Sequence, residues 1–197
     1  MIKEFCIHRY RKAFNSLYRH LYILHNRFMR KHLIILLLLA LPITAITAQQ
    51  DRSFYKKLSD AAMELTKDNV VYDPQYYSIP YPNGDVPAGK GVCTDVVIRA
   101  YRKLGIDLQQ KIHEDMRANF GKYPKKWGMK KTDRNIDHRR VRNQAMFFSR
   151  FGTVKKISDK GEDYLPGDIV TWDLGNGITH IGIVTGRMTR DKKRPLI

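Results

Sequence analysis

The residue best suited to chemistry in this sequence is Cys93. From Cys93 onward apolar residues recur at i, i+3, i+4, i+7 and i+11, and this spacing predicts an amphipathic helix that stops at Gly105. The unpaired N–H groups at a helix start favour a thiolate, which is the nucleophilic form of cysteine. The alternative is a small buried residue of the core, and the spacing leaves both interpretations open.

A nucleophilic thiol needs a base to take its proton, and His180 is the best candidate. His180 opens an apolar strand over residues 180–184, and we expect Gly182 to leave the same face of that strand uncrowded. If the Cys93 helix packs on this strand, the sulfur and an imidazole nitrogen should lie about 3 to 4 Å apart. The alternative is a strand-end histidine bonded to a backbone carbonyl.

The elements that must position this pair are helices followed by strands, an α+β order. The helices are predicted over residues 53–68, 93–104, 107–120 and 138–151, and the strands over 169–173 and 178–185. A turn over residues 175–177 joins the strands into an antiparallel hairpin. The Cys93 helix should bury Val96, Val97, Ala100 and Leu104. The long irregular segment 71–90 should line the cleft with its tyrosines.

The N-terminal 48 residues have the pattern of a secretory signal peptide with an extended basic n-region. Residues 33–50 carry no charge, a basic stretch precedes them, and small residues end at Ala48. Met29 could be the true start, and an uncleaved anchor is the alternative to cleavage after Ala48. We therefore expect an exported protein, periplasmic or extracellular, whose single domain covers residues 49–197 and contacts a membrane only if the signal is kept.

The charge and cysteine content of this domain narrow the choice of partner. Of the net charge of +17 for the whole chain, +10 lies after residue 48, with the basic residues scattered. A basic exported domain suits peptidoglycan or another anionic envelope polymer, whereas no feature of a nucleic-acid-binding protein accompanies the charge. Solubility alone is the plain alternative. Cys93 has no cysteine partner within the domain, and the spacing of the three remaining histidines predicts neither a metal site nor a cofactor.

Several longer motifs resemble a known family. Residues 81–87 (Tyr-Pro-Asn-Gly-Asp-Val-Pro), 91–102 around Cys93, 135–141 (Asn-Ile-Asp-His-Arg-Arg-Val), 165–172 and 180–184 are similar to a YijF-like bacterial family of unknown function. That family resembles the NlpC-type, papain-like cell-wall cysteine peptidases and amidases. The resemblance implies Cys93 as nucleophile, His180 as base and amide bonds of the cell wall as substrate. It also implies helices packed on a small antiparallel sheet, with the C-terminal strands cut short.

Other polar and aromatic residues of these motifs are candidates for substrate binding: Tyr72, Tyr81, Asp95, His138, Arg139 and Trp172. Arg139 or Arg140 could bind a carboxylate through two hydrogen bonds, and Asp137 is more simply explained as a helix N-cap. Papain-like sites use a third residue to orient the histidine, and the chain ends where we expect that strand to begin. The alternative function is therefore an envelope-binding or peptidoglycan-binding domain that keeps the fold without turnover.

Overall fold

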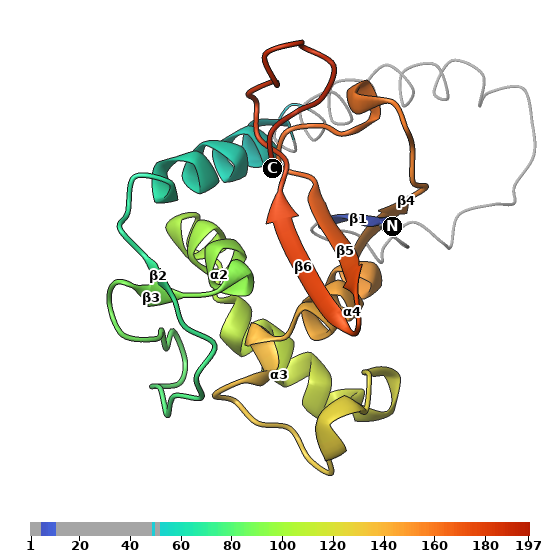
Figure 1. Cartoon of the computed structure of the whole chain (residues 1–197). Helices are drawn as coiled ribbons and strands as arrows, with labels where there is room; N and C mark the ends of the chain where they lie inside the picture. Colours follow the sequence, from blue (N-terminus) through green and yellow to red (C-terminus); the bar gives the residue numbers. More distant parts are fainter. Residues whose placement is uncertain (1–4, 11–48, 50–51) are drawn as a thin grey trace, which may run out of the picture.

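The computed structural model describes residues 5–10, 49 and 52–197 of the chain (Figure 1). The helical elements are a helix over residues 52–65, α2 (Cys93–Lys103), α3 (Leu108–Ala118), α4 (Val141–Phe151) and the short 3-10 helices η1 (Phe120–Lys122), η2 (Lys126–Gly128), η3 (Asp137–Arg139) and η4 (Gly161–Asp163). The strands are β1 (Phe5–Tyr10), β2 (Val71–Tyr72), β3 (Lys90–Gly91), β4 (Gly152–Lys155), β5 (Ile169–Gly175) and β6 (Ile178–Ile183). The α+β class predicted from the sequence is confirmed.

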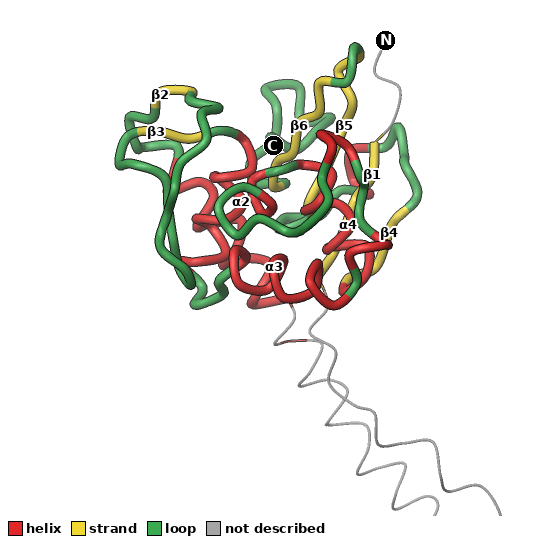
Figure 2. The backbone as a smooth tube through the Cα atoms, turned by 90° about the horizontal axis from the view of Figure 1, so that it is seen from below, coloured by secondary structure: helices red, strands yellow, loops and turns green. Residues whose placement is uncertain are grey.

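The main sheet has four antiparallel strands in the order β4-β1-β5-β6. The short parallel β2–β3 ladder lies apart from it (Figure 2). Strand β1 pairs with β4 on one side and with β5 on the other. We had left residues 1–28 out of the domain, whereas the structure places residues 5–10 inside this sheet. The predicted apolar segment and cleavage point over residues 33–48 lie outside the described residues.

The β5–β6 hairpin forms where the sequence predicted it, with a longer first strand. Strand β5 runs to Gly175 rather than ending at Asp173, and the register shifts between these two residues. Gly175, Asn176 and Gly177 all have positive φ, at 91°, 54° and 79°. Glycine and asparagine are the residues that adopt this left-handed region at low cost, so the turn follows from its composition.

Helix α2 begins at Cys93, as predicted, but its buried face is rotated from the one we expected. Val97 and Ala100 are buried, whereas Val96 is 43% exposed and Ile98 is buried at 2%. The buried side of α2 also contains polar groups that bond to neighbouring segments. A prediction from hydrophobic spacing alone therefore placed the buried face slightly wrongly. Tyr101 of this face is fully buried and its ring lies 5.6 Å from that of Phe148 in α4.

One large hydrophobic core joins the helices to the sheet. It contains residues from all four long helices and from both hairpin strands, among them Leu58, Val97, Ile112, Phe148, Ile169, Ile181 and Ile183. A smaller cluster of Val170 and Val184, with Trp172 and Tyr164 against it, lies apart from this core. Since neighbouring residues of a strand face opposite sides, β5 contributes to both clusters, and Val184 joins the smaller one directly after β6 ends. Within the described residues, no helix has the length and apolar character needed to span a bilayer.

Candidate active site

The start of helix α2 holds Cys93 at the edge of the sheet. Cys93 packs against the core that contains Ile181 of β6, and the backbone N–H of Ile181 acts to lower the pKa of the Cys93 thiol. His180 directly precedes Ile181, and it lies in the middle of β6 rather than opening the strand as we expected, because β6 begins at Ile178. Cys93 is partly buried and packs against the main core. The structure therefore packs the start of α2 against the strand that contains His180.

The protonation of Cys93 differs from our expectation. Burial raises the pKa of the Cys93 thiol above its ordinary value, and the nearby Asp95 carboxylate acts in the same direction. The N–H groups of Ile181, Thr94 and Cys93 itself oppose this effect and are outweighed. We expected the helix start to favour a thiolate, but desolvation of the sulfur disfavours the charged form. In the ligand-free structure Cys93 is a thiol at neutral pH.

His180 stands on β6 opposite Trp172 of β5, and the two rings meet edge-on with centroids 4.7 Å apart. Its neighbours Ile181 and Ile183 are buried in the main core, so His180 alternates to the other side of the strand. Burial lowers the pKa of His180, which keeps the imidazole neutral at pH 7. A neutral imidazole is the form that can accept a proton from a thiol.

The two side chains are not hydrogen-bonded to each other in this structure. Among the described residues, no hydrogen bond involves the ring of His180, and His180 is not among the groups that shift the pKa of Cys93. The separation of about 3 to 4 Å stays a prediction. Our expectation that Gly182 leaves this face open is wrong, because a Cβ atom there would lie 2.4 Å from Cγ2 of Ile197 and 3.6 Å from the Trp172 ring.

A buried ion pair fixes the start of α2. Arg139 donates from Nε to Oδ1 and from Nη2 to Oδ2 of Asp95, both at 2.9 Å, and the side chains are 2% and 3% exposed. Asp95 Oδ2 also accepts the N–H of Val92 at 2.8 Å. Arg139 further donates to the carbonyl of Gln75 at 2.9 Å. We predicted that Asp95 and Arg139 bind substrate. In the structure their polar groups form hydrogen bonds with each other and with the backbone instead.

Further bonds tie the same helix start to η3 and α4. Thr94 Oγ1 donates to the carbonyl of Arg139 at 3.0 Å. Gln144 of α4 donates to the carbonyls of Thr94 at 3.2 Å and of His138 at 2.8 Å. Sequence reasoning missed Thr94 and Gln144. Each is a polar residue on the buried side of a predicted helix. Such a position indicates a hydrogen bond to another segment only when the position of that segment is known.

Asp137 and His138 are buried and play a different part from the one predicted. Helix α4 has Arg140 as its N-cap, and Asp137 instead begins η3, where it pairs with Arg140 at 3.4 Å and accepts the N–H of Asp133. The Asp137 N-cap prediction is therefore wrong. Burial raises the pKa of Asp137 to about 6 and lowers that of His138 to about 4. His138 is 2% exposed, which leaves it almost no surface for contact with a substrate.

The three aromatic candidates are spread over different surroundings. Tyr72 lies on β2 and is 73% exposed. Tyr81 packs edge-on against His113 at 5.3 Å between ring centroids, and its pKa is raised first by burial and then by Glu114. Of the three, Trp172 contacts His180. Trp172 is therefore the aromatic candidate that lies beside one of the two predicted catalytic residues, His180.

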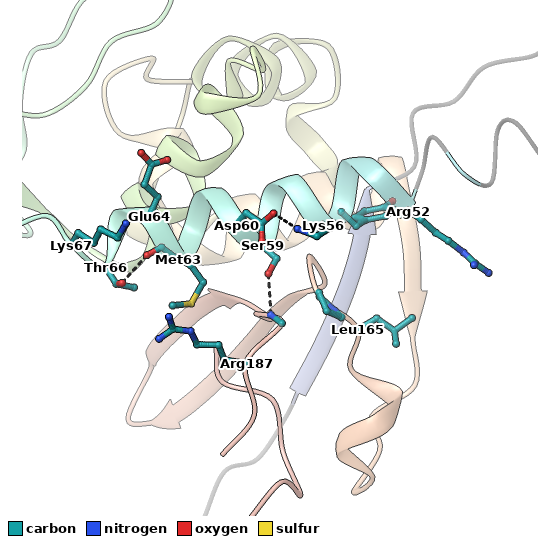
Figure 3. A pocket seen from close by; sticks show the side chains of 13 residues that line it. Arg52, Lys56, Ser59, Asp60, Met63, Glu64, Thr66, Lys67, Leu165 and Arg187 are labelled. Carbon is teal, nitrogen blue, oxygen red and sulfur yellow. Dashed lines mark hydrogen bonds and ion pairs between the residues drawn. The ribbon is translucent and has the colours of Figure 1, made fainter. Parts of the chain in front are cut away.

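A large pocket lies elsewhere, between the helix over residues 52–65 and the chain segments at Pro166 and Gly186 (Figure 3). It has a volume of about 1170 Å³. Two of its lining residues are bonded to each other, because the hydroxyl of Ser59 accepts the N–H of Gly186 at 3.0 Å. Neither Cys93 nor His180 lines it. No group of three or more histidine, cysteine, aspartate or glutamate side chains suited to a metal ion occurs within the described residues.

The fold and the site define an α+β domain with one cysteine at a helix start beside a strand histidine. Residues 59–197 match the family described as a domain of unknown function (DUF1287), and the chain belongs to this family. It is 45% identical over 152 residues to the uncharacterized protein YijF of Escherichia coli (strain K12), covering 77% of this chain and 73% of that protein. No solved structure matches the chain.

Proposed function

We propose that this domain is a cysteine-dependent hydrolase, a peptidase or amidase that cleaves amide bonds of the bacterial cell wall. The observation that carries the proposal is the packing of Cys93, at the start of α2, against the core face of β6 at Ile181, the residue next to His180. Residues 91–102 and 180–184 resemble the YijF-like family, and the resemblance of that family to NlpC-type enzymes implies the same pairing and a papain-like fold. The basic net charge supports an anionic envelope polymer as partner after export.

The proposed reaction follows from the protonation states of the two residues. Neutral His180 takes the proton of the Cys93 thiol as the sulfur attacks the amide carbonyl. The C–N bond then breaks, the amine leaves with the proton returned by His180, and a thioester remains on Cys93. Water, activated by His180, hydrolyses the thioester and restores the thiol. The backbone N–H of Cys93 at the helix start can donate to the developing oxyanion.

Substrate binding has to bring the pair into contact. The His180 ring has an edge contact with Trp172 and no hydrogen bond within the described part of the chain. Since the ring projects from the side of β6 opposite Ile181, it has to move around this outer strand of the sheet to reach Cys93. Catalytic hydrogen bonds are often long in empty sites and shorten when the substrate binds. The buried Asp95–Arg139 pair meanwhile keeps the helix start in place. The proposed site thus combines a fixed nucleophile with a base that adjusts.

Incubation of the purified protein with peptidoglycan fragments tests this proposal, with mass spectrometry of the products. We expect new fragments separated by cleavage at an amide bond, and none with the Cys93→Ala variant. Intact fragments with the wild-type protein, under conditions where the domain is folded, would contradict hydrolysis.

A second candidate function is a non-catalytic domain that binds the envelope or its peptidoglycan. Two observations favour it: burial raises the pKa of the Cys93 thiol, and no described hydrogen bond joins this thiol to His180. The same incubation separates the two functions. A pure binding domain would sediment with insoluble peptidoglycan equally well as wild type and as Cys93→Ala, and would leave every fragment intact.

A further inference from the structure

A second pocket, with a volume of about 740 Å³, lies between the end of α3 and the segment over residues 128–135. Its lining is strongly basic, with Arg117, Lys130, Lys131, Arg134, Arg140 and His113. These residues come from three separate stretches of chain, so folding gathers their charge around one hollow. We refer to it below as the basic pocket.

Most of this positive charge has no acidic partner. Arg117, Lys130, Lys131 and Arg134 form no ion pair with any residue that the structure describes, whereas Arg140 pairs with Asp137. The lining contains one carboxylate, Asp133, and its oxygens already accept hydrogen bonds within the protein: from the Tyr76 hydroxyl at 3.1 Å and the Asn135 N–H at 2.9 Å. The local charge is therefore clearly positive.

His113, which lines the basic pocket, responds to the positive charge around it. Its Nδ1 atom is buried and has no hydrogen-bond partner within the described residues, while its ring packs on Tyr81. The pKa of His113 is lowered first by burial and then by Arg117 and Arg134. Arg134 also lies over the Tyr81 ring, at 6.0 Å from its centroid. A buried ring nitrogen without a partner costs free energy unless a ligand or solvent satisfies it.

We propose that the basic pocket is a binding site for oxyanion groups, carboxylate or phosphate, of an acidic ligand. The guanidinium groups of Arg117 and Arg134 match the geometry of both groups through paired hydrogen bonds, and Lys130 and Lys131 add charge at the rim. Mutually repelling cations around one hollow are stabilised by an anion that neutralises them together. Binding of this kind does not require Cys93 to be catalytic.

The basic pocket is also joined to the surroundings of Cys93. Asn135, which lines the pocket, accepts the N–H of Ile79 at 3.1 Å, and so helps to hold the segment over residues 71–90. Four residues further along the chain, the carbonyl of Arg139 accepts the hydroxyl of Thr94. An anion held at the pocket would thus be anchored on the segment that also contacts the start of α2.

Calorimetric titration of the full chain at low salt tests this inference with three probes. They are a penta-glutamate peptide, a penta-glutamine peptide of the same length, and inorganic pyrophosphate. The variant Lys130→Gln/Arg134→Gln removes two charges of the pocket. The matched control, Lys156→Gln/Lys160→Gln, removes two exposed charges that lie outside it.

We expect the penta-glutamate peptide, pyrophosphate or both to bind, and penta-glutamine not to bind. The pocket variant should weaken binding by at least about tenfold, or about threefold for each charge, and the control by less than about twofold. Binding of penta-glutamate alone identifies carboxylates as the ligand groups, and binding of pyrophosphate alone identifies phosphate. The His113 ring signals in NMR spectra should shift with the bound probe. Equal weakening in both variants, equal binding of penta-glutamine, or no binding at all would overturn the inference.

Discussion

The start of helix α2 and the middle of strand β6 pack together at Cys93, yet the two regions are held in very different ways. On the helix side, the Asp95–Arg139 pair is almost fully buried and Thr94 bonds to the next segment. On the strand side, Ile178 is 60% exposed and no hydrogen bond to the His180 ring occurs within the described residues. The difference teaches that side-chain bonds hold the start of α2 in the candidate site, whereas no hydrogen bond within the described residues holds the His180 ring.

The same contrast appears in the ion pairs of the two regions. The Asp95–Arg139 pair has two short parallel bonds in a dry environment, where an unpaired charge is very costly. The Arg142–Asp173 pair, which ties the hairpin to α4, has a single bond of 3.2 Å, and both side chains are about one third exposed. Water screens the second pair, so it contributes little. Substitutions in the two regions should therefore differ in size.

The largest effect is expected from Asp95→Ala, which leaves Arg139 buried and without its partner. We predict that the free energy of unfolding falls by about 3–5 kcal/mol, as measured by urea denaturation. Asp173→Ala is the matched control and should change it by less than about 1 kcal/mol. Equal losses in the two variants would show that the start of α2 is not the more firmly fixed of the two regions.

The helix side also contains two buried groups whose pKa shifts act in opposite directions. Because the pKa of His138 is lowered to about 4, its contribution to stability is lost as pH falls from about 6.5 to 4. Because the pKa of Asp137 is raised to about 6, its contribution is present at acid pH and is lost as pH rises from about 4 to 6. In the wild-type protein these two trends offset each other in part.

The variant His138→Gln should expose the Asp137 trend. We predict that its free energy of unfolding falls by roughly 2–3 kcal/mol between pH 4 and pH 6, while the wild type changes less. Urea denaturation at a series of pH values measures both slopes, which are independent of any constant loss caused by the substitution. Identical slopes in the two proteins would mean that His138 is not buried in its neutral form.

On the strand side, Gly182→Ala tests how closely the face of His180 is covered. The new Cβ atom would lie 2.4 Å from Cγ2 of Ile197, so that side chain must move. Ile197 is 51% exposed and has room to do so, and we expect a loss of about 1 kcal/mol. Gly186→Ala is the control, since nothing lies within 4 Å of its added Cβ atom. A loss above about 3 kcal/mol would show that this side is as rigid as the start of α2.

The smallest effect concerns the reactivity of the thiol. Since burial raises the pKa of Cys93, we predict that iodoacetamide labels the folded protein more slowly at pH 7 than it labels an unstructured cysteine peptide. The labelling rate should rise with pH and reach its midpoint above that of the peptide. Mass spectrometry of the adduct measures it. Faster labelling than the peptide at pH 7 would show a thiolate stabilised by the helix start after all.

Local patterns in the sequence were enough to predict the helices around Cys93 and the hairpin. The start of α2 followed from apolar spacing and the turn from Gly175-Asn176-Gly177, because both depend on neighbouring residues. The rotation of the α2 face was missed because Thr94 and Asp95 are buried by partners more than forty residues away. Strand β1 was missed for the same reason, since its partners lie in β4 and β5.

The candidate site was predicted in part. The meeting of the Cys93 helix with the His180 strand follows from the hydrophobic faces that pack together, and the structure places both there. The roles of Asp95 and Arg139 could not be predicted, because two opposite charges far apart in the sequence carry no sign that they will pair. The basic pocket was also missed. The paired lysines at residues 130–131 indicated positive charge in this segment. The pocket itself depends on α3, which packs beside the segment and could not be placed from the sequence.

The most direct test of the central claim compares peptidoglycan hydrolysis by the wild type, Cys93→Ala and His180→Ala, with the release of new amino groups as the readout. We predict hydrolysis by the wild type, none with Cys93→Ala, and a rate about 10²–10⁴ times lower with His180→Ala. The free energy of unfolding of His180→Ala should stay within about 1 kcal/mol of the wild type, because the ring makes few contacts. A His180→Ala variant as active as the wild type would contradict the pairing of Cys93 with His180.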